Sequence, residues 1–283
     1  MRLLRRSFSV TVNAFYAFLA DDGWAIASHI ALSVLMALFP FLIVVTALGG
    51  FFGSKQLADE VANLILETWP AQVASPIARE VNNVLTTTRG GVLTIGVVLS
   101  VYFASSGIES LRIGLNRAYN MAELRAWWLL RLESIAYVLV GAVALLLFAF
   151  LIVLGPLIFV TALRYAPWLQ PLEPSFNVVR YAVATVVLVI ALVLVHLWLP
   201  AGRRRLREIA PGVITTLLLW LATGVLFGRY LAEFAGSYVT TYAGLASVMI
   251  ALVFLYWTAS IFVFGGELNA EIMKERAREK VDG

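Results

Sequence analysis

Residues 244–269 read GLASVMIALVFLYWTASIFVFGGELN, and no charged residue occurs in this stretch before Glu267. A helix of about 20 apolar residues is long enough to cross the hydrocarbon core of a bilayer. Within lipid, each backbone group of such a segment must find its hydrogen-bond partner inside the helix. The stretch therefore predicts a membrane-spanning helix that ends in a short polar segment, GGELN.

The rest of the chain has the same character. Of its 283 residues, 61% are hydrophobic and only 13% are charged, and its mean hydropathy is +0.89. Soluble domains are about half apolar and about a quarter charged. The composition predicts an all-α fold, a polytopic membrane helix bundle with six transmembrane helices over about 28–52, 91–107, 134–162, 179–199, 210–232 and 244–266.

Three parts follow from this pattern. Residues 1–27 are predicted to contain an amphipathic helix at the cytoplasmic interface, with Arg5 and Arg6 on a face away from Phe8, Phe15 and Phe18. Asp21, Asp22 and Gly23 are expected to break this helix. Residues 28–270 form the six-span membrane domain, in which 53–90 is an outer segment with apolar residues at helical spacing. Residues 271–283 form a basic and acidic cytoplasmic tail.

The positions of the basic residues predict the orientation. Cytoplasmic loops of membrane proteins carry an excess of Lys and Arg, and most of the 21 such residues fall on one side if six spans are drawn with both termini inside. Removing the short second span would place the cluster from Arg203 to Arg207 outside. The pattern therefore favours a multi-pass protein of a bacterial inner membrane with cytoplasmic N- and C-termini.

A polar stripe extends the second span. Ser105, Glu109, Arg112 and Asn116 share one helix face, whereas Ile108, Leu111 and Leu115 share another, and we expect the stripe at the cytoplasmic boundary. An ionisable group at such depth is paired or faces water. Two roles fit the stripe: a site that binds an anionic headgroup or an ion, or an ion-paired contact that fixes the order of the helices. The full set of candidate binding residues is Ser105, Glu109, Arg112, Asn116, Arg117, Glu267, Asn269 and, at the opposite boundary, Arg229.

Two further expectations concern these residues and the helix contacts. Glu267 is expected to pair with Arg112 or Arg117, because an isolated carboxylate there is costly. Arg229 has Glu233 four residues away on the same helix. Positions expected to kink a helix or to pack closely are Pro40, Gly107, Gly155, Pro156, Gly224 and Gly228.

Several kinds of chemistry have no residues to support them. The chain has no cysteine and only two histidines, His29 and His196, and it contains no GxxxxGK[ST] phosphate loop. A metal-dependent nuclease needs carboxylates or histidines that converge on a cation. We therefore expect a protein that is not an enzyme, with no cofactor, no metal and no nucleic-acid partner.

Three blocks of sequence, in order, resemble one family. The first runs from ASHIALS at 27–33 to LFP at 38–40, the second from YFASSG at 102–107 to LNRAY at 115–119, and the third from YAGLA at 242–246 to GGELNAE at 265–271. Together they resemble the YihY/BrkB inner-membrane proteins, formerly labelled ribonuclease BN. The resemblance implies a role in the cell envelope, with handling of lipids suspected.

Three functions stay open at this stage. The first is a transporter or translocase of anionic envelope lipids, the second is a transporter of ions or small solutes, and the third is a scaffold for an envelope machine that transports nothing. The expected partners are membrane lipids, with an envelope protein or a second copy of the chain as further candidates.

The orientation can be tested by labelling single cysteines, because no native cysteine interferes. We expect Leu206→Cys to react with a membrane-impermeant maleimide only after the cytoplasmic side is opened. Leu57→Cys should react in intact cells. Labelling of Leu206→Cys from outside would contradict six spans with a cytoplasmic N-terminus.

Overall fold

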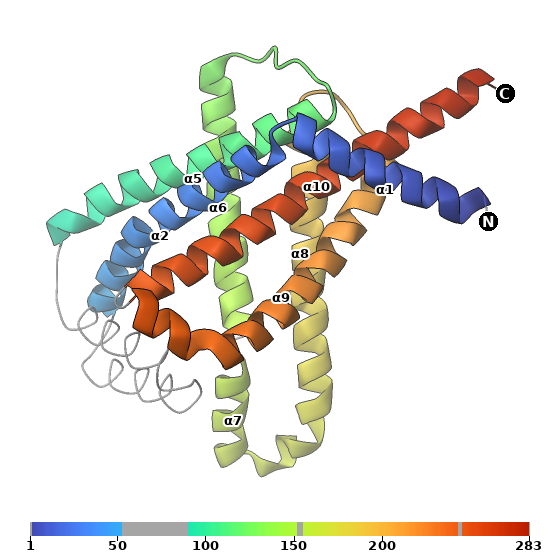
Figure 1. Ribbon diagram of the computed structural model, residues 1–283. Coiled ribbons are helices and arrows are strands. Elements are labelled where there is room, and N and C mark those ends of the chain that lie inside the picture. The colour runs from blue at the N-terminus through green and yellow to red at the C-terminus, as the bar shows by residue number, and fades with distance from the viewer. Residues whose placement is uncertain (1, 53–89, 152–154, 243–244, 283) are drawn as a thin grey trace. The chain divides into compact units, whose positions relative to one another are not determined.

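The computed structural model describes residues 2–52, 90–151, 155–242 and 245–282, and within these ranges the chain is helical and contains no strand. The element order is α1 (Arg2–Ala20), α2 (Gly23–Phe52), α5 (Gly90–Ala118), α6 (Trp127–Ala149), α7 (Gly155–Tyr165), the 3-10 helix η2 (Pro167–Leu172), α8 (Glu173–Trp198), α9 (Leu206–Tyr242) and α10 (Ala246–Asp282). Figure 1 shows these helices along the chain. The predicted all-α membrane helix bundle is confirmed.

Helix length and composition account for the spans. Candidate spans in the described chain are Thr94–Ala118, Trp127–Leu147, Pro167–Trp198, Leu206–Glu233 and Ala246–Glu279, and the apolar stretch Gly23–Leu38 is shorter. The first predicted span, 28–52, lies within α2. The predicted outer segment, 53–90, lies outside the described residues except for Gly90, where α5 begins.

The predicted third span, 134–162, covers α6 up to Ala149 and α7 from Gly155, and residues 152–154 lie outside the described residues. The kink expected at Gly155 and Pro156 therefore stays a prediction. One helix extends beyond its predicted span. The fifth span is longer than 210–232, because α9 continues from Leu206 to Tyr242.

The chain divides into two compact units. One comprises Met1–Leu32 with Ser105–Gly283, and the other comprises Ser33–Ala104. In the second unit Pro40 is buried within α2, and the rings of Tyr102 and Phe103 meet edge to face with centroids 5.5 Å apart. All of the contacts described below lie in the first unit.

A tight turn separates α1 from α2. Asp22 has a φ of 57°, a left-handed conformation that aspartate tolerates better than most residues. A Cβ on Gly23 would lie 2.4 Å from the ring of Phe18, so only glycine fits there. The predicted break at Asp21, Asp22 and Gly23 is therefore confirmed.

Helix α1 packs along α10 (Figure 1). Ala14 and Phe18 are buried, whereas Phe8 and Phe15 are exposed. The apolar face predicted for α1 is thus used partly for packing against α10, and its placement at a membrane interface stays a prediction.

The closest approach of two helices is that of α9 to α10 around Gly212 and Gly265. A Cβ on Gly212 would lie 2.1 Å from the carbonyl oxygen of Gly265, and a Cβ on Gly265 would lie 2.2 Å from Oγ1 of Thr216. Any side chain at either position would force the backbones apart. On the adjacent face of α10, a Cβ on Gly266 would meet Leu115 of α5 at 2.7 Å. We refer to this contact of Gly212, Gly265 and Gly266 with their neighbours as the glycine crossing.

Asn269 fastens the glycine crossing with its side-chain amide. Its Oδ1 accepts a hydrogen bond of 2.6 Å from the Gly212 N–H, and its Nδ2 donates one of 3.3 Å to the Tyr119 hydroxyl just beyond α5. Asn269 is fully buried. Without its side chain, the Gly212 N–H and the Tyr119 hydroxyl would each lose a buried hydrogen-bond partner, which is costly. One residue of α10 therefore joins α9 to the end of α5.

The expected packing face at Gly224 and Gly228 is not used in the described chain. A Cβ at either position would meet no described atom within 4 Å. The glycine spacing on α9 was thus misleading, because α9 meets α10 through Gly212 nearer its start. Gly107, by contrast, is buried in α5.

Candidate functional site

Arg112 is the most enclosed charge on the predicted polar stripe. Its side chain is 3% exposed, and Nη1 donates to the Leu130 carbonyl at 3.1 Å and to the Ser134 hydroxyl at 3.3 Å. Carboxylate oxygens of Glu109 and Glu133 lie 3.5 Å and 4.0 Å from its guanidinium. Arg112 of α5 therefore binds to the first turns of α6.

Two more arginines complete this cluster. Arg131 binds Glu109 at 3.0 Å, and Arg125 binds Glu133 at 2.8 Å and Glu123 at 2.7 Å. We call this set the α5–α6 charge network; its members are Glu109, Arg112, Glu123, Arg125, Arg131 and Glu133. Since its carboxylates match its guanidinium groups in number, the network carries no net charge of its own.

The network also holds the chain that follows α8. Arg125 donates to the Leu199 carbonyl at 3.1 Å. Asn116 accepts a hydrogen bond of 2.6 Å from the Ala201 N–H and donates one of 3.1 Å to Glu123. The ends of α5, α6 and α8 are therefore joined through polar groups.

The pKa values outside the spans reflect this pairing. Hydrogen bonds from Arg125 lower the pKa of Glu123 to about 2, and those same bonds raise the pKa of Arg125. Both groups stay ionised throughout the physiological range. Burial raises the pKa of Tyr119 to about 12, so its hydroxyl stays neutral. The contacts are therefore stable toward ordinary changes of pH.

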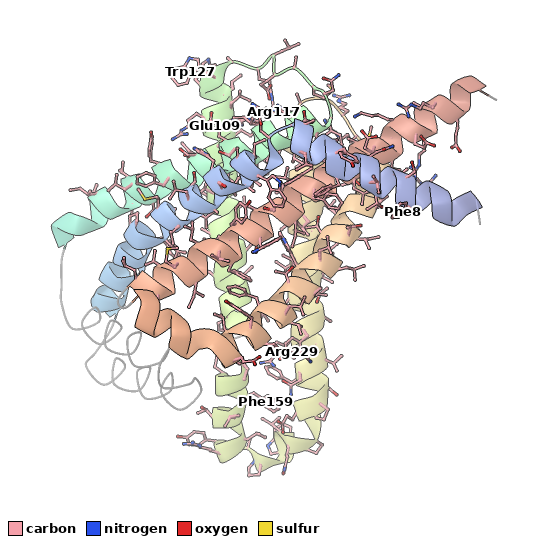
Figure 2. All side chains as sticks on the ribbon, in the orientation of Figure 1. Phe8, Glu109, Arg117, Trp127, Phe159 and Arg229 are labelled. Atoms are coloured by element: carbon pink, nitrogen blue, oxygen red, sulfur yellow. The ribbon has the colours of Figure 1, made fainter. Side chains whose placement is uncertain are left out.

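The candidate residues chosen from sequence separate into groups. Ser105, Arg112 and Asn116 are buried and lie with Glu109 along α5, and Figure 2 labels Glu109 and Arg117 there. Arg117 instead reaches back to the α1–α2 turn, where it binds Asp22 at 3.1 Å with both side chains largely exposed.

The expected ion pair between Glu267 and Arg112 or Arg117 is wrong. Both arginines bind other carboxylates, and neither oxygen of Glu267 has a hydrogen-bond partner among the described residues. Glu267 occupies the face of α10 toward α1, and the acidic side chain that acts on it most strongly is that of Asp21.

Arg229 lies apart from these groups near the other end of α9 (Figure 2). Its side chain is exposed, and in the described part of the chain it forms no ion pair with Glu233. The structure brings none of the other candidate residues to it.

Sequence reasoning missed the residues of α6 and of the loop before it. Glu123, Glu133 and Ser134 complete the coordination of the arginines, yet Arg125 and Arg131 had served only as indicators of topology. The available signal was the presence of charges of both signs, Glu123, Arg125, Arg131 and Glu133, in one short stretch.

A basic surface lies where α9 meets α10. Pro211 has no N–H, so the carbonyl of Arg207 lacks its usual partner within α9. Arg276 of α10 donates to that carbonyl at 3.5 Å. The side chain of Arg276 is thereby held against the backbone at the start of α9. We call Arg203, Arg205, Arg207 and Arg276 the basic patch; all are exposed, and none forms an ion pair within the described part of the chain.

Aromatic residues flank the same end of the first unit. Trp127 and Trp128 begin α6, Trp198 ends α8, and their exposed fractions are 79%, 56% and 64%. Tyr119 lies under Arg204, whose guanidinium carbon is 3.9 Å from the ring centroid. Burial lowers the pKa of Arg204. Exposed tryptophan beside arginine is typical of the boundary between hydrocarbon and headgroups.

The α5–α6 charge network predicts unequal effects for two arginines on one helix. Arg112→Ala would remove the buried donor of the Leu130 carbonyl and the Ser134 hydroxyl, while Glu109 and Glu133 keep Arg131 and Arg125 as partners, and we expect a loss of about 1–3 kcal/mol of stability. Arg117→Ala breaks only an exposed pair, worth at most about 1 kcal/mol. Thermal unfolding in detergent, followed by tryptophan fluorescence, measures both. Equal losses would show that Arg112 is not the centre of the network.

Comparisons with known proteins agree with this fold. The family model described as virulence factor BrkB matches residues 14–283. The ribonuclease-like protein YfkH of Bacillus subtilis is 26% identical over 93% of this chain and 94% of its own length. A UPF0761 membrane protein of Rhodospirillum centenum is 26% identical over 95% of this chain, which spans 58% of that relative. No solved structure matches. The match over nearly the whole chain shows that this multi-pass membrane protein belongs to the virulence factor BrkB family.

Proposed function

We propose that the protein acts on anionic lipids of the bacterial cell envelope, as a transporter or translocase in the inner membrane with both termini in the cytoplasm. The observation that carries this proposal is the basic patch. Its four arginines are exposed and form no ion pair within the described residues, and Arg276 of α10 binds the backbone carbonyl of Arg207 at the start of α9. A phosphate group would supply a counter-charge for these arginines and accept hydrogen bonds from their guanidinium groups.

The surroundings of the basic patch favour a lipid as the source of that phosphate. The exposed tryptophans at the same end of the first unit support a position of the patch near the headgroups. Arginines near an anionic leaflet gain about 1 kcal/mol each from its surface potential. A lipid headgroup is concentrated at that depth, whereas a soluble anion is not.

Arg112 is a poor headgroup ligand by comparison. It is buried and bound to carboxylates of its own chain, so an incoming phosphate would have to displace them. The α5–α6 charge network has a structural role for the basic patch. Arg125 binds the Leu199 carbonyl and so holds the chain just before Arg203.

We propose that the protein catalyses no covalent reaction. One relative is named as ribonuclease-like, but in the described part of the chain no group of three His, Asp or Glu side chains could hold a metal ion. We therefore expect the purified protein not to cleave RNA, and a nuclease is not the function proposed. A scaffold that transports nothing is the alternative that the lipid experiment must separate.

Removing charge from the basic patch should weaken the binding of anionic lipid. We expect the double variant Arg207→Gln with Arg276→Gln to copurify several-fold less phosphatidylglycerol and cardiolipin, measured by mass spectrometry. In reconstituted vesicles, transbilayer movement of fluorescent phosphatidylglycerol should slow in parallel.

The matched control is Lys274→Gln with Arg278→Gln. This control also removes two positive charges, both from α10. Its two side chains are already paired with Glu271 and Glu275. Equal unfolding temperatures would show that both double variants are folded. If the two retain the same lipid and the same transbilayer rate as the parent, the scaffold is the better explanation.

A further inference from the structure

The carboxyl group of Glu267 lies inside the first unit without a partner. The residue is 1% exposed, and neither of its oxygens has a hydrogen-bond partner among the described residues. The glycine crossing immediately before it fixes the rotation of α10, because Gly265 faces α9 and Gly266 faces α5. Glu267 therefore cannot turn toward solvent without breaking that contact.

Asp21 directly follows α1, the helix that packs along α10. Of the described acidic side chains, that of Asp21 acts most strongly on the carboxyl group of Glu267. The backbone of Asp21 is held on both sides, since its N–H donates to the Ala17 carbonyl at 2.9 Å and its carbonyl accepts from Arg117 at 3.2 Å. The negative end of the α1 helix dipole also points at this place.

The charged groups around the two carboxyls do not neutralise them. Lys274, about two turns further along α10, is bound to Glu271 at 2.6 Å. Arg117 of α5 is bound to Asp22 at 3.1 Å. Tyr119 is neutral and is bound to Asn269. Each positive charge that faces the pair is thus already shared with another carboxylate.

Two adjacent carboxylates with one of them buried cannot both stay ionised without a counter-charge. We propose that Asp21 and Glu267 form a binding site for a single cation, either a proton shared between the carboxyl groups or a sodium ion held by their oxygens. Carboxylate oxygens suit both, and the shared chemistry is one positive charge between two carboxyl groups. The site joins α1 to α10, so occupancy holds α1 in place.

The two cations are separated by the thermal stability of the purified full-length chain. Unfolding is followed from mildly acidic to mildly alkaline pH, in sodium chloride and in choline chloride at equal ionic strength. A proton site predicts an unfolding temperature several degrees lower at alkaline pH in both salts, because the pair then loses its proton and repels. A sodium site predicts that sodium, and not choline, restores the lost degrees at alkaline pH.

Variants assign the response to this pair. Glu267→Gln keeps the shape of the side chain without its charge, so its unfolding temperature should depend on neither alkaline pH nor sodium. Glu271→Gln, one turn later on the same helix, should respond as the parent does. If Glu267→Gln does not fold, Asp21→Asn leaves a single carboxyl and should lose most of the response. A parent unaffected by both pH and sodium, or a Glu267→Gln variant that responds like the parent, would overturn the site.

Discussion

The approach of Gly212 to Gly265 is the constraint on which the rest of the first unit depends. Backbone meets backbone there, so the rotation and depth of α10 against α9 are fixed to within the width of a methyl group. Once α10 is placed, Gly266 must face α5, Glu267 must face α1, and Asn269 must reach both Gly212 and Tyr119. Within lipid, moving an apolar side chain from the bilayer into a helix contact gains little free energy. Helices therefore associate tightly where small residues let their backbones approach closely.

This arrangement separates two kinds of charge. The α5–α6 charge network is internally balanced and holds helix ends together, so its arginines are structural. The basic patch and the Asp21–Glu267 pair are not balanced by the described residues around them. The arginines of the patch form no ion pair within the described residues, where Glu208 binds only the Arg205 N–H, and the pair has carboxylates without a free cation. Proposals about ligands therefore rest on these two places, of opposite sign.

Much of the fold could be predicted from the sequence because lipid imposes simple rules. Apolar length located the helices, and the turn at Asp22 and Gly23 followed from residues that tolerate unusual backbone conformations. The polar face of α5 was also visible from spacing. The partners across that face were not, since a helical pattern shows which residues share a side but not which helix that side meets. Glu267 was thus assigned to Arg112 or Arg117, although neither arginine binds it in the structure. The spacing of Gly224 and Gly228 predicted a helix contact on α9. The close contact instead pairs Gly212 of α9 with Gly265 of α10, and no spacing within one helix shows that pairing.

The most direct test of this account is the stability of Gly212→Ala against that of Gly224→Ala, measured by thermal unfolding of each purified protein. Both substitutions add one methyl group to α9. At Gly212 it would collide with the Gly265 carbonyl, and at Gly224 it meets no described atom within 4 Å. We predict that Gly212→Ala loses about 1–3 kcal/mol or more through overpacking. Gly224→Ala should be at least as stable as the parent, because alanine favours the helix by about 1 kcal/mol over glycine. Equal stability of the two variants would contradict the glycine crossing.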